Sequence, residues 1–198
     1  MSSERILSFP KHFSGRDPVK PARWLLGKKL VRQTGSKRVS GIIVETEAYG
    51  GPDDLECHAY RKKTERNAAM FEAPGQVYVY LIYGMYHCVN ISCGPKGQGY
   101  AVLIRALEPE DGTSHMRTNR KQDNESRLCR GPGCLCQALS IDRKSINYEH
   151  VFTSDKIWLE NGRRISKVTA GPRIGISQST ELPWRFYERE SKYVSKPN

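Results

Sequence analysis

The sequence has no long apolar stretch. None approaches the roughly 18–20 consecutive apolar residues that a membrane-spanning helix needs, and residues 1–10 lack the apolar core of a secretory signal peptide. It also has no internal repeat, no low-complexity tract and no obvious interdomain linker. These absences predict a single intracellular domain without a membrane partner, and 198 residues are enough to build a proper core.

Cysteine occurs six times but never as a C-x-x-C pair. The group closest to metal spacing is Cys129, Cys134 and Cys136, and no histidine lies near it. The chain is neither short nor visibly secreted, so a disulfide framework is not expected. We predict reduced thiols, no metal and no cofactor, with a zinc site as the weaker alternative.

Acidic side chains are scarce relative to basic ones. The chain has 32 Lys and Arg against 21 Asp and Glu, which gives a net charge of +11. This excess favours a nucleic-acid partner, and the alternative is solvated surface charge without a polyanion. The excess is distributed, because residues 114–173 carry twelve basic and six acidic side chains and residues 11–38 are also basic.

Residues 41–60 reverse this balance, with five acidic side chains and no Lys or Arg. In an extended segment Glu45, Glu47 and Tyr49 would share one face. Two acids and an aromatic residue after an apolar run are poor core material, and His58 follows in a Gly-Pro loop that could fold back over them. Carboxylate, histidine and tyrosine side chains move protons or stack on flat ligands, so Glu47 is a candidate catalytic base. A solvated or salt-bridged glutamate is the alternative.

The patterning predicts a mixed α+β fold: a single domain with a curved, mostly antiparallel β-sheet flanked by helices, and a protruding β-hairpin. Residues 1–17 are expected to be a flexible N-terminal arm, and residues 18–198 the single domain. Helices are predicted at 18–26, at 67–71 and after the Gly131-Pro132-Gly133 turn. Strands are predicted at 29–32, 41–49, 77–82, 86–92, 100–107, 156–160, 173–177 and 184–187.

Four tyrosines crowd the predicted hairpin. Tyr78 and Tyr86 are interpreted as a cross-strand aromatic pair in the core. Tyr83 differs, because a Tyr-Gly turn would project it beyond the sheet, where it could wedge into a base stack or sit in a protein interface. Arg105 near a strand end fits either a surface ion pair or a site residue. The Gly131-Pro132-Gly133 turn fits either a phosphate site or a plain start of a helix.

Taken together, these segments resemble the alkyladenine (3-methyladenine) DNA glycosylase family of base-excision repair. The matching motifs run in order from Pro18 to Ser195: Leu25-Leu26-Gly27-Lys28, Val44-Glu45-Thr46-Glu47-Ala48-Tyr49, Arg66-Asn67, Met70-Phe71, Pro74-Gly75, Tyr78-Val79-Tyr80, Ile82-Tyr83-Gly84-Met85-Tyr86, Asn90-Ile91-Ser92, Arg105-Ala106-Leu107-Glu108-Pro109, Gly131-Pro132-Gly133, Arg173-Ile174-Gly175 and Arg185-Phe186-Tyr187.

The resemblance implies an enzyme that flips an alkylated or deaminated purine out of duplex DNA and hydrolyses its N-glycosidic bond with an activated water. Glu47 would activate the water, and Arg105 would orient the water or the carboxylate. The implied base-binding residues are Tyr49, His58, Tyr80 and Asn90. The implied intercalating residue is Tyr83. The implied DNA-backbone contacts are Met85, Arg117, Arg120, Arg130, Gly131 and Gly133.

The resemblance further implies a monofunctional enzyme without metal or cofactor, acting as a monomer on double-stranded DNA with damaged purines such as 3-methyladenine or hypoxanthine. Two residues depart from the family pattern: Cys134, where lysine is common, and His87, where an apolar residue is common. The rival hypotheses are a nucleic-acid-binding module without chemistry and an enzyme acting on RNA or free nucleosides. A sugar hydrolase using Glu45 and Glu47 fits poorly, because the two cannot flank a sugar from opposite sides.

Overall fold

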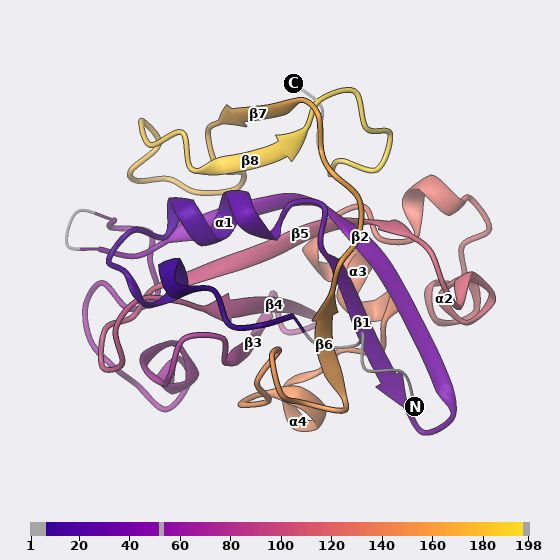
Figure 1. Cartoon of the computed structure of the whole chain (residues 1–198), viewed down its shortest axis with the longest axis horizontal. Helices are drawn as coiled ribbons and strands as arrows, with labels where there is room; N and C mark the ends of the chain where they lie inside the picture. The colour runs from indigo at the N-terminus through magenta and orange to yellow at the C-terminus, as the bar shows by residue number, and fades with distance from the viewer. Residues whose placement is uncertain (1–6, 52–53, 196–198) are drawn as a thin grey trace.

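The computed structural model describes residues 7–51 and 54–195 and shows a mixed α+β fold built on one curled antiparallel sheet (Figure 1). The strands along the sheet follow the order β3-β4-β5-β2-β1-β6, and β8 joins β2 and carries β7. Their bounds are β1 Lys29–Thr34, β2 Lys37–Tyr49, β3 Val77–Ile82, β4 Tyr86–Ser92, β5 Ala101–Pro109, β6 Ile157–Glu160, β7 Val168–Gly171 and β8 Arg185–Glu188. The predicted fold class is confirmed.

Strand β2 is the longest because its two halves have different neighbours on one edge. Its first half pairs with β1, and Glu45–Glu47 pair with β8, while β5 runs along the other edge. The β2–β5 register shifts on either side of Glu45, and Arg105 lies in this irregular stretch without a Cα partner. Such irregularities re-aim side chains, so this bulge sets the direction in which Arg105 points.

Short helices cover the sheet. The α-helices are α1 Val19–Leu25, α2 Thr113–Arg120, α3 Pro132–Ala138 and α4 Arg143–Ile146, and the 3₁₀ helices are Lys11–Ser14, Ala68–Phe71 and Glu125–Arg127. Asp17 accepts a hydrogen bond from the Val19 N–H at the start of α1, whose N-cap residue is Pro18. The sequence did not predict α2 and α4, because α2 buries only Met116 and α4 only Ile146. No helix in the described ranges is long and apolar enough to cross a membrane.

The main hydrophobic core lies between the sheet and these helices and includes Leu25, Ile43, Ile104 and Leu135. Phe13 also belongs to it, with a fully buried side chain, so residues 11–14 are packed onto the domain rather than loosely held. Residues 1–6 of the predicted arm lie outside the described residues.

Two local predictions were wrong. Residues 173–177 form no strand, because the partner of β8 on this edge is β7, and Arg173 instead buries its guanidinium against Asp54. Tyr86 is about half exposed rather than a core residue, whereas Tyr78 is buried as predicted.

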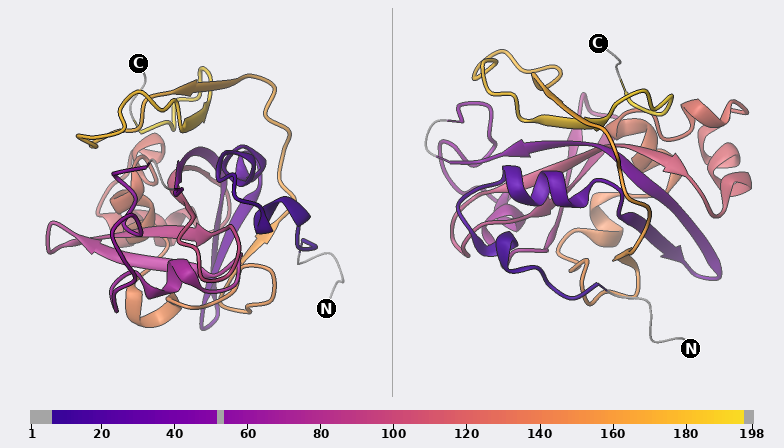
Figure 2. Two further views of the ribbon diagram at one scale, coloured as in Figure 1. Left: turned by 90° about the vertical axis from the view of Figure 1, so that its left-hand side faces the viewer. Right: turned by 45° about the horizontal axis from the view of Figure 1, so that its top comes forward.

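Strands β3 and β4 form the predicted hairpin, which projects from the body of the protein (Figure 2, left view). Tyr83 and Gly84 form its turn with φ angles of +54° and +69°, and the Met85 N–H donates to the Ile82 carbonyl over 3.2 Å. Both central residues have positive φ, which is the two-residue turn geometry that suits the twist of a hairpin. The turn therefore directs the Tyr83 side chain out into solvent, where it is 82% exposed.

Candidate active site

A single cavity of about 560 Å³ brings together side chains from β2, β3, β4 and β5, the start of α3 and two loops. Nine residues predicted for the site line it: Tyr49, His58, Tyr80, Tyr83, Asn90, Arg105, Arg120, Gly131 and Gly133. Positions far apart in the sequence therefore converge on one pocket. Its size suits a flat ligand of the dimensions of a purine base.

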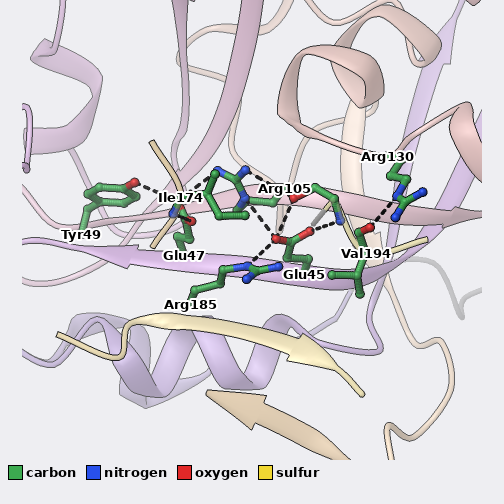
Figure 3. A network of polar contacts seen from close by, with 9 residues as sticks. Glu45, Glu47, Tyr49, Arg105, Arg130, Ile174, Arg185 and Val194 are labelled. Atoms are coloured by element: carbon green, nitrogen blue, oxygen red, sulfur yellow. Dashed lines mark hydrogen bonds and ion pairs between the residues drawn. The ribbon is translucent and has the colours of Figure 1, made fainter. Parts of the chain in front are cut away.

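Glu47 lies between Tyr49, Arg105 and Ile174 (Figure 3), and these three residues line the pocket whereas Glu47 does not. Its side chain is fully buried, and its Oε2 accepts from the Tyr49 hydroxyl over 2.8 Å and from Arg105 Nη1 over 3.2 Å. Its Oε1 accepts from the Ile174 N–H over 2.8 Å. All three donors line the pocket, so Glu47 is one contact away from any molecule bound there.

Glu45 lies on the same face of β2 but has different partners. Its Oε1 accepts from Arg185 Nε over 2.7 Å and from the Ser195 hydroxyl over 2.8 Å, and its Oε2 accepts from the Ser195 N–H over 2.6 Å. Arg105 joins the two acids, since its Nε donates to Glu45 over 3.2 Å. Burial lowers the pKa of Arg105, but the Glu47 and Glu45 carboxylates raise it more, so the guanidinium stays charged.

Aromatic rings form the wall of the pocket. His58 lies edge-on to Tyr80 with ring centroids 4.6 Å apart, and its Nδ1 is 3.1 Å from the Tyr78 hydroxyl. Partial removal from water and the Arg66 guanidinium lower the pKa of His58, which favours the neutral ring at neutral pH. Burial and the Glu47 carboxylate hold the pKa of Tyr49 well above its usual value, so its hydroxyl keeps its proton and donates a hydrogen bond to Glu47.

Asn90 lies in the buried part of the pocket and is oriented by a hydrogen bond from its Nδ2 to the Tyr78 carbonyl over 3.1 Å. Cys88, which the sequence did not suggest, also lines the pocket, opposite Tyr80 across the hairpin. Burial raises the pKa of this thiol, so it stays protonated.

Comparison with known proteins identifies the family. The family described as Methylpurine-DNA glycosylase (MPG) matches residues 12–192, which is most of the chain. The chain belongs to the methylpurine-DNA glycosylase family. The resemblance predicted from the sequence motifs is thereby confirmed, and the protein is a DNA glycosylase, a hydrolase of DNA repair.

Individual relatives agree with this assignment. A protein of Methanocella arvoryzae named "Putative 3-methyladenine DNA glycosylase" is 46% identical over 191 residues, covering 94% of this chain and 95% of its own length. Proteins of Bacillus cereus and Bacillus anthracis with the same name are 44% and 43% identical, covering 94% of this chain and 98% of their own lengths.

Of the six residues predicted to contact the DNA backbone, three line the cavity of this glycosylase: Arg120, Gly131 and Gly133. Arg120 Nη2 donates to the Cys134 thiol sulfur over 3.1 Å, so the cysteine that replaces a common lysine is in contact with a cation. Gly133 is required by close packing, because a Cβ there would lie 3.2 Å from the Tyr86 side chain.

Three other predicted DNA contacts lie outside the pocket wall. Met85 is 66% exposed at the tip of the hairpin, next to Tyr83. Arg117 on α2 pairs with Glu125 over 3.4 Å. Arg130 Nε donates to the Val194 carbonyl over 2.7 Å. Arg117 and Arg130 therefore have partners within the protein and would need to share them, or exchange them, to contact a phosphate.

Sequence reasoning missed the groups that hold Glu45 and Glu47 in place from the C-terminal part of the chain, namely Ile174, Arg185 and Ser195. The Arg173-Ile174-Gly175 and Arg185-Phe186-Tyr187 motifs contained a signal, but nothing in their spacing shows that they pack beside β2. Among the described residues, no group of three His, Cys, Asp or Glu side chains is placed to hold a metal ion.

Proposed function

We propose that this glycosylase flips an alkylated or deaminated purine out of duplex DNA and hydrolyses its N-glycosidic bond with a water molecule activated by Glu47. The observation that carries the proposal is the position of Glu47: a buried carboxylate whose three hydrogen-bond donors all line the pocket. A catalytic base must lie within hydrogen-bond reach of the reacting water, and the contact of Glu47 with three residues of the pocket wall supports this role.

Arg105 orients the reacting groups in this proposal. It is paired with both Glu45 and Glu47 and is itself part of the pocket wall. Because Glu45 holds the guanidinium from one side, the Glu47 carboxylate is held in one orientation before a substrate binds. Preorganisation of this kind lowers the barrier without rearrangement during the reaction.

Base flipping is needed because a stacked base cannot reach a pocket enclosed in this way, and it costs a few kcal/mol. Tyr83 is our candidate for the residue that fills the vacated space, since it projects from a rigid two-residue turn and is 82% exposed. An exposed aromatic side chain gains burial when it enters a base stack. The cost of flipping is smallest for damaged or mispaired bases, which selects lesions before the pocket does.

Once flipped, the base would stack between the rings of Tyr49, Tyr80 and His58. Bases alkylated at ring nitrogens carry positive charge and are therefore attracted to aromatic faces. The His58 N–H makes no backbone hydrogen bond within the described part of the chain, so it is free to read the edge that distinguishes a lesion from adenine. Asn90, held by the Tyr78 carbonyl, would clash with the 2-amino group of normal guanine.

The reaction would be hydrolytic only, with no covalent link to the protein and no cleavage of the DNA strand. No lysine lines the pocket among the described residues, so the wall offers no amine for a Schiff base. Duplex DNA would be held through phosphates by the basic residues around the cavity, without sequence preference and with strong salt dependence. We propose that one protein molecule acts alone on each lesion.

The test is single-turnover excision from a set of duplexes, each with one damaged base. The damaged base is 3-methyladenine or 7-methylguanine, hypoxanthine, or ethenoadenine. Wild-type protein should release the free base and leave an intact strand with an abasic site, and Glu47→Gln should release the base at least about 10²-fold more slowly while still binding the lesion duplex. Strand cleavage by the wild type would refute the hydrolytic mechanism. If Glu47→Gln turned over at the wild-type rate, Glu47 would have no role in the chemistry.

A further inference from the structure

Arg173 lies directly behind Tyr49, and neither the proposed chemistry nor the base contacts use it. Its guanidinium carbon is 4.5 Å from the centroid of the Tyr49 ring and 5.5 Å from that of Trp184, so it is held between two aromatic rings. It is 4% exposed and forms a bidentate ion pair with Asp54 over 2.7 and 2.8 Å. It also donates to the Ala48 carbonyl over 3.1 Å.

This cation is on the side of the Tyr49 ring away from the substrate. Tyr49 lines the cavity and Arg173 does not, so the other face of the ring is the one available to a bound base. Burial lowers the pKa of Arg173, but the hydrogen bonds and charge of Asp54 raise it more, and the guanidinium stays protonated. At long range the Asp54 carboxylate cancels much of the charge of Arg173. The electrostatic effect of Arg173 is therefore confined to the ring that it contacts.

A cation on one face of an aromatic ring draws π-electron density toward itself. The opposite face then attracts a second cation less strongly, while stacking with a neutral base, which depends on dispersion and area, is little affected. Tyr49 is therefore a poorer platform for a positively charged base than an isolated tyrosine would be. Its neighbour His58, which is favoured in the neutral form, adds no charge of its own.

We propose that Arg173 is a specificity-determining residue that acts through Tyr49. It reduces the preference of the pocket for cationic alkylated purines over neutral damaged purines, and so allows the pocket to hold the neutral ones as well. This inference rests on the proposed function, because it assumes that Tyr49 stacks on the flipped base. The alternative is a purely structural clamp. Since the next residue, Ile174, donates to Glu47, damage to such a clamp would slow excision of every base to the same extent.

The experiment compares two bases in single-turnover excision from duplex DNA: 7-methylguanine, which is cationic, and hypoxanthine, which is neutral. The double variant Asp54→Asn/Arg173→Gln removes both charges and leaves no unpaired buried ion. The matched control Arg173→Lys keeps the cation but loses the bidentate pair. Each rate is divided by the wild-type rate for the same base, so that differences between the leaving groups cancel.

The double variant should raise the ratio of 7-methylguanine to hypoxanthine excision about threefold to tenfold. Arg173→Lys should leave this ratio within about twofold of the wild type, even where both rates fall. An unchanged ratio in the double variant, or an equal rise with Arg173→Lys, would overturn the proposal. If the wild type released neither base, the proposed function itself would fail, which is a different result.

If thermal unfolding shows that the double variant does not fold, a second measurement still tests the proposal. Tyr49→Leu removes the ring and leaves the ion pair of Asp54 and Arg173 in place. If Arg173 has already weakened the pocket face of the ring, excision of both bases should fall by similar factors, within about threefold of each other. A much larger loss for 7-methylguanine would show that the ring attracts cations at full strength, and would overturn the proposal.

Discussion

The floor and the rim of the pocket are built in opposite ways. The floor, which we define as Glu45, Glu47 and Arg105, is buried, and the three side chains are bound to one another and to Arg185 and Ser195. The rim, which we define as Tyr83, Met85 and Arg120, is largely or partly exposed, and its two hairpin residues project into solvent.

This difference shows which part of the pocket is held rigidly. A buried carboxylate is tolerated only with several donors, so the floor has its final geometry without DNA. The two hairpin residues of the rim, Tyr83 and Met85, are 82% and 66% exposed, so they contribute little to folding. Changes to the floor should therefore alter chemistry and stability, and changes to the rim should alter DNA binding alone.

The largest effect is expected from Glu47→Gln. Because the amide cannot accept a proton from water, single-turnover excision should fall by about 10²- to 10⁴-fold, the usual share of a general base. The amide keeps the shape of the side chain, and Arg105 remains paired with Glu45, so the affinity for a lesion duplex should change by less than about threefold. Rapid-quench kinetics and equilibrium binding measure the two quantities. A fall in both by equal factors would show that Glu47 holds substrate rather than activating water.

The variant Glu45→Gln separates the contributions of the two acids within the floor. The substitution removes the buried ion pair of Glu45 with Arg185, so the free energy of unfolding should fall by about 3–5 kcal/mol in urea titrations. Glu47→Gln should cost less stability. Excision by the folded fraction of Glu45→Gln at low temperature should remain within about tenfold of the wild type, because the base itself is intact. A larger stability loss in Glu47→Gln than in Glu45→Gln would reverse these assignments.

On the rim, Tyr83→Asn should weaken binding to a lesion duplex by about 1–3 kcal/mol, since one aromatic stacking contact is lost. Asparagine tolerates the positive φ of +54° at this position. Tyr148→Asn is the matched control, because Tyr148 is also an exposed tyrosine with positive φ but does not line the pocket. Fluorescence titration with duplex and thermal unfolding should show weaker binding for Tyr83→Asn alone and unchanged stability for both.

A smaller effect on stability and on base binding is expected when the pH is lowered, through His58 in the pocket wall between floor and rim. The pKa of His58 lies below its usual 6.5, so the folded protein favours the neutral ring. The stability from this preference is present above pH 6.5 and is lost as the pH falls through the lowered folded pKa. Binding of a cationic base should weaken over the same range, because protonated His58 would repel it. Binding by His58→Gln should lose this pH dependence, whereas an unchanged profile would assign it to another group.

The smallest effect is expected from Cys134→Lys. A lysine beside Arg120 would add one phosphate contact, so the slope of log K against log salt concentration should steepen by about 0.9. Excision at low salt should not change. Cys129→Ser, at a buried thiol that does not line the pocket, is the control for cysteine loss. A slope unchanged by Cys134→Lys would show that no phosphate approaches this part of the rim.

Much of the fold could be predicted from the sequence, because it is encoded locally. The hairpin of β3 and β4 follows from alternating β-branched and aromatic residues around Tyr83-Gly84, and α1 from Asp17-Pro18. Predictions failed where local pattern is weak: α2 is polar, and the strand expected at 173–177 competes with a better edge partner, Val168–Gly171. The position of a strand on an edge depends on its neighbour as well as on its own propensity.

The sequence by itself determined which chemical groups are available: an acid pair two residues apart on one strand, an aromatic hairpin with a Tyr-Gly tip, and a basic surface that suits DNA. Only the tertiary structure decided which acid contacts the residues that line the pocket. Glu45 and Glu47 are the same residue type on the same buried strand face, and their hydrogen-bond partners differ because Arg185 and Ser195 fold back onto Glu45 while Tyr49 and Ile174 bind Glu47. Long-range contacts of this kind carry no periodic signal in the sequence, since they depend on how distant segments pack.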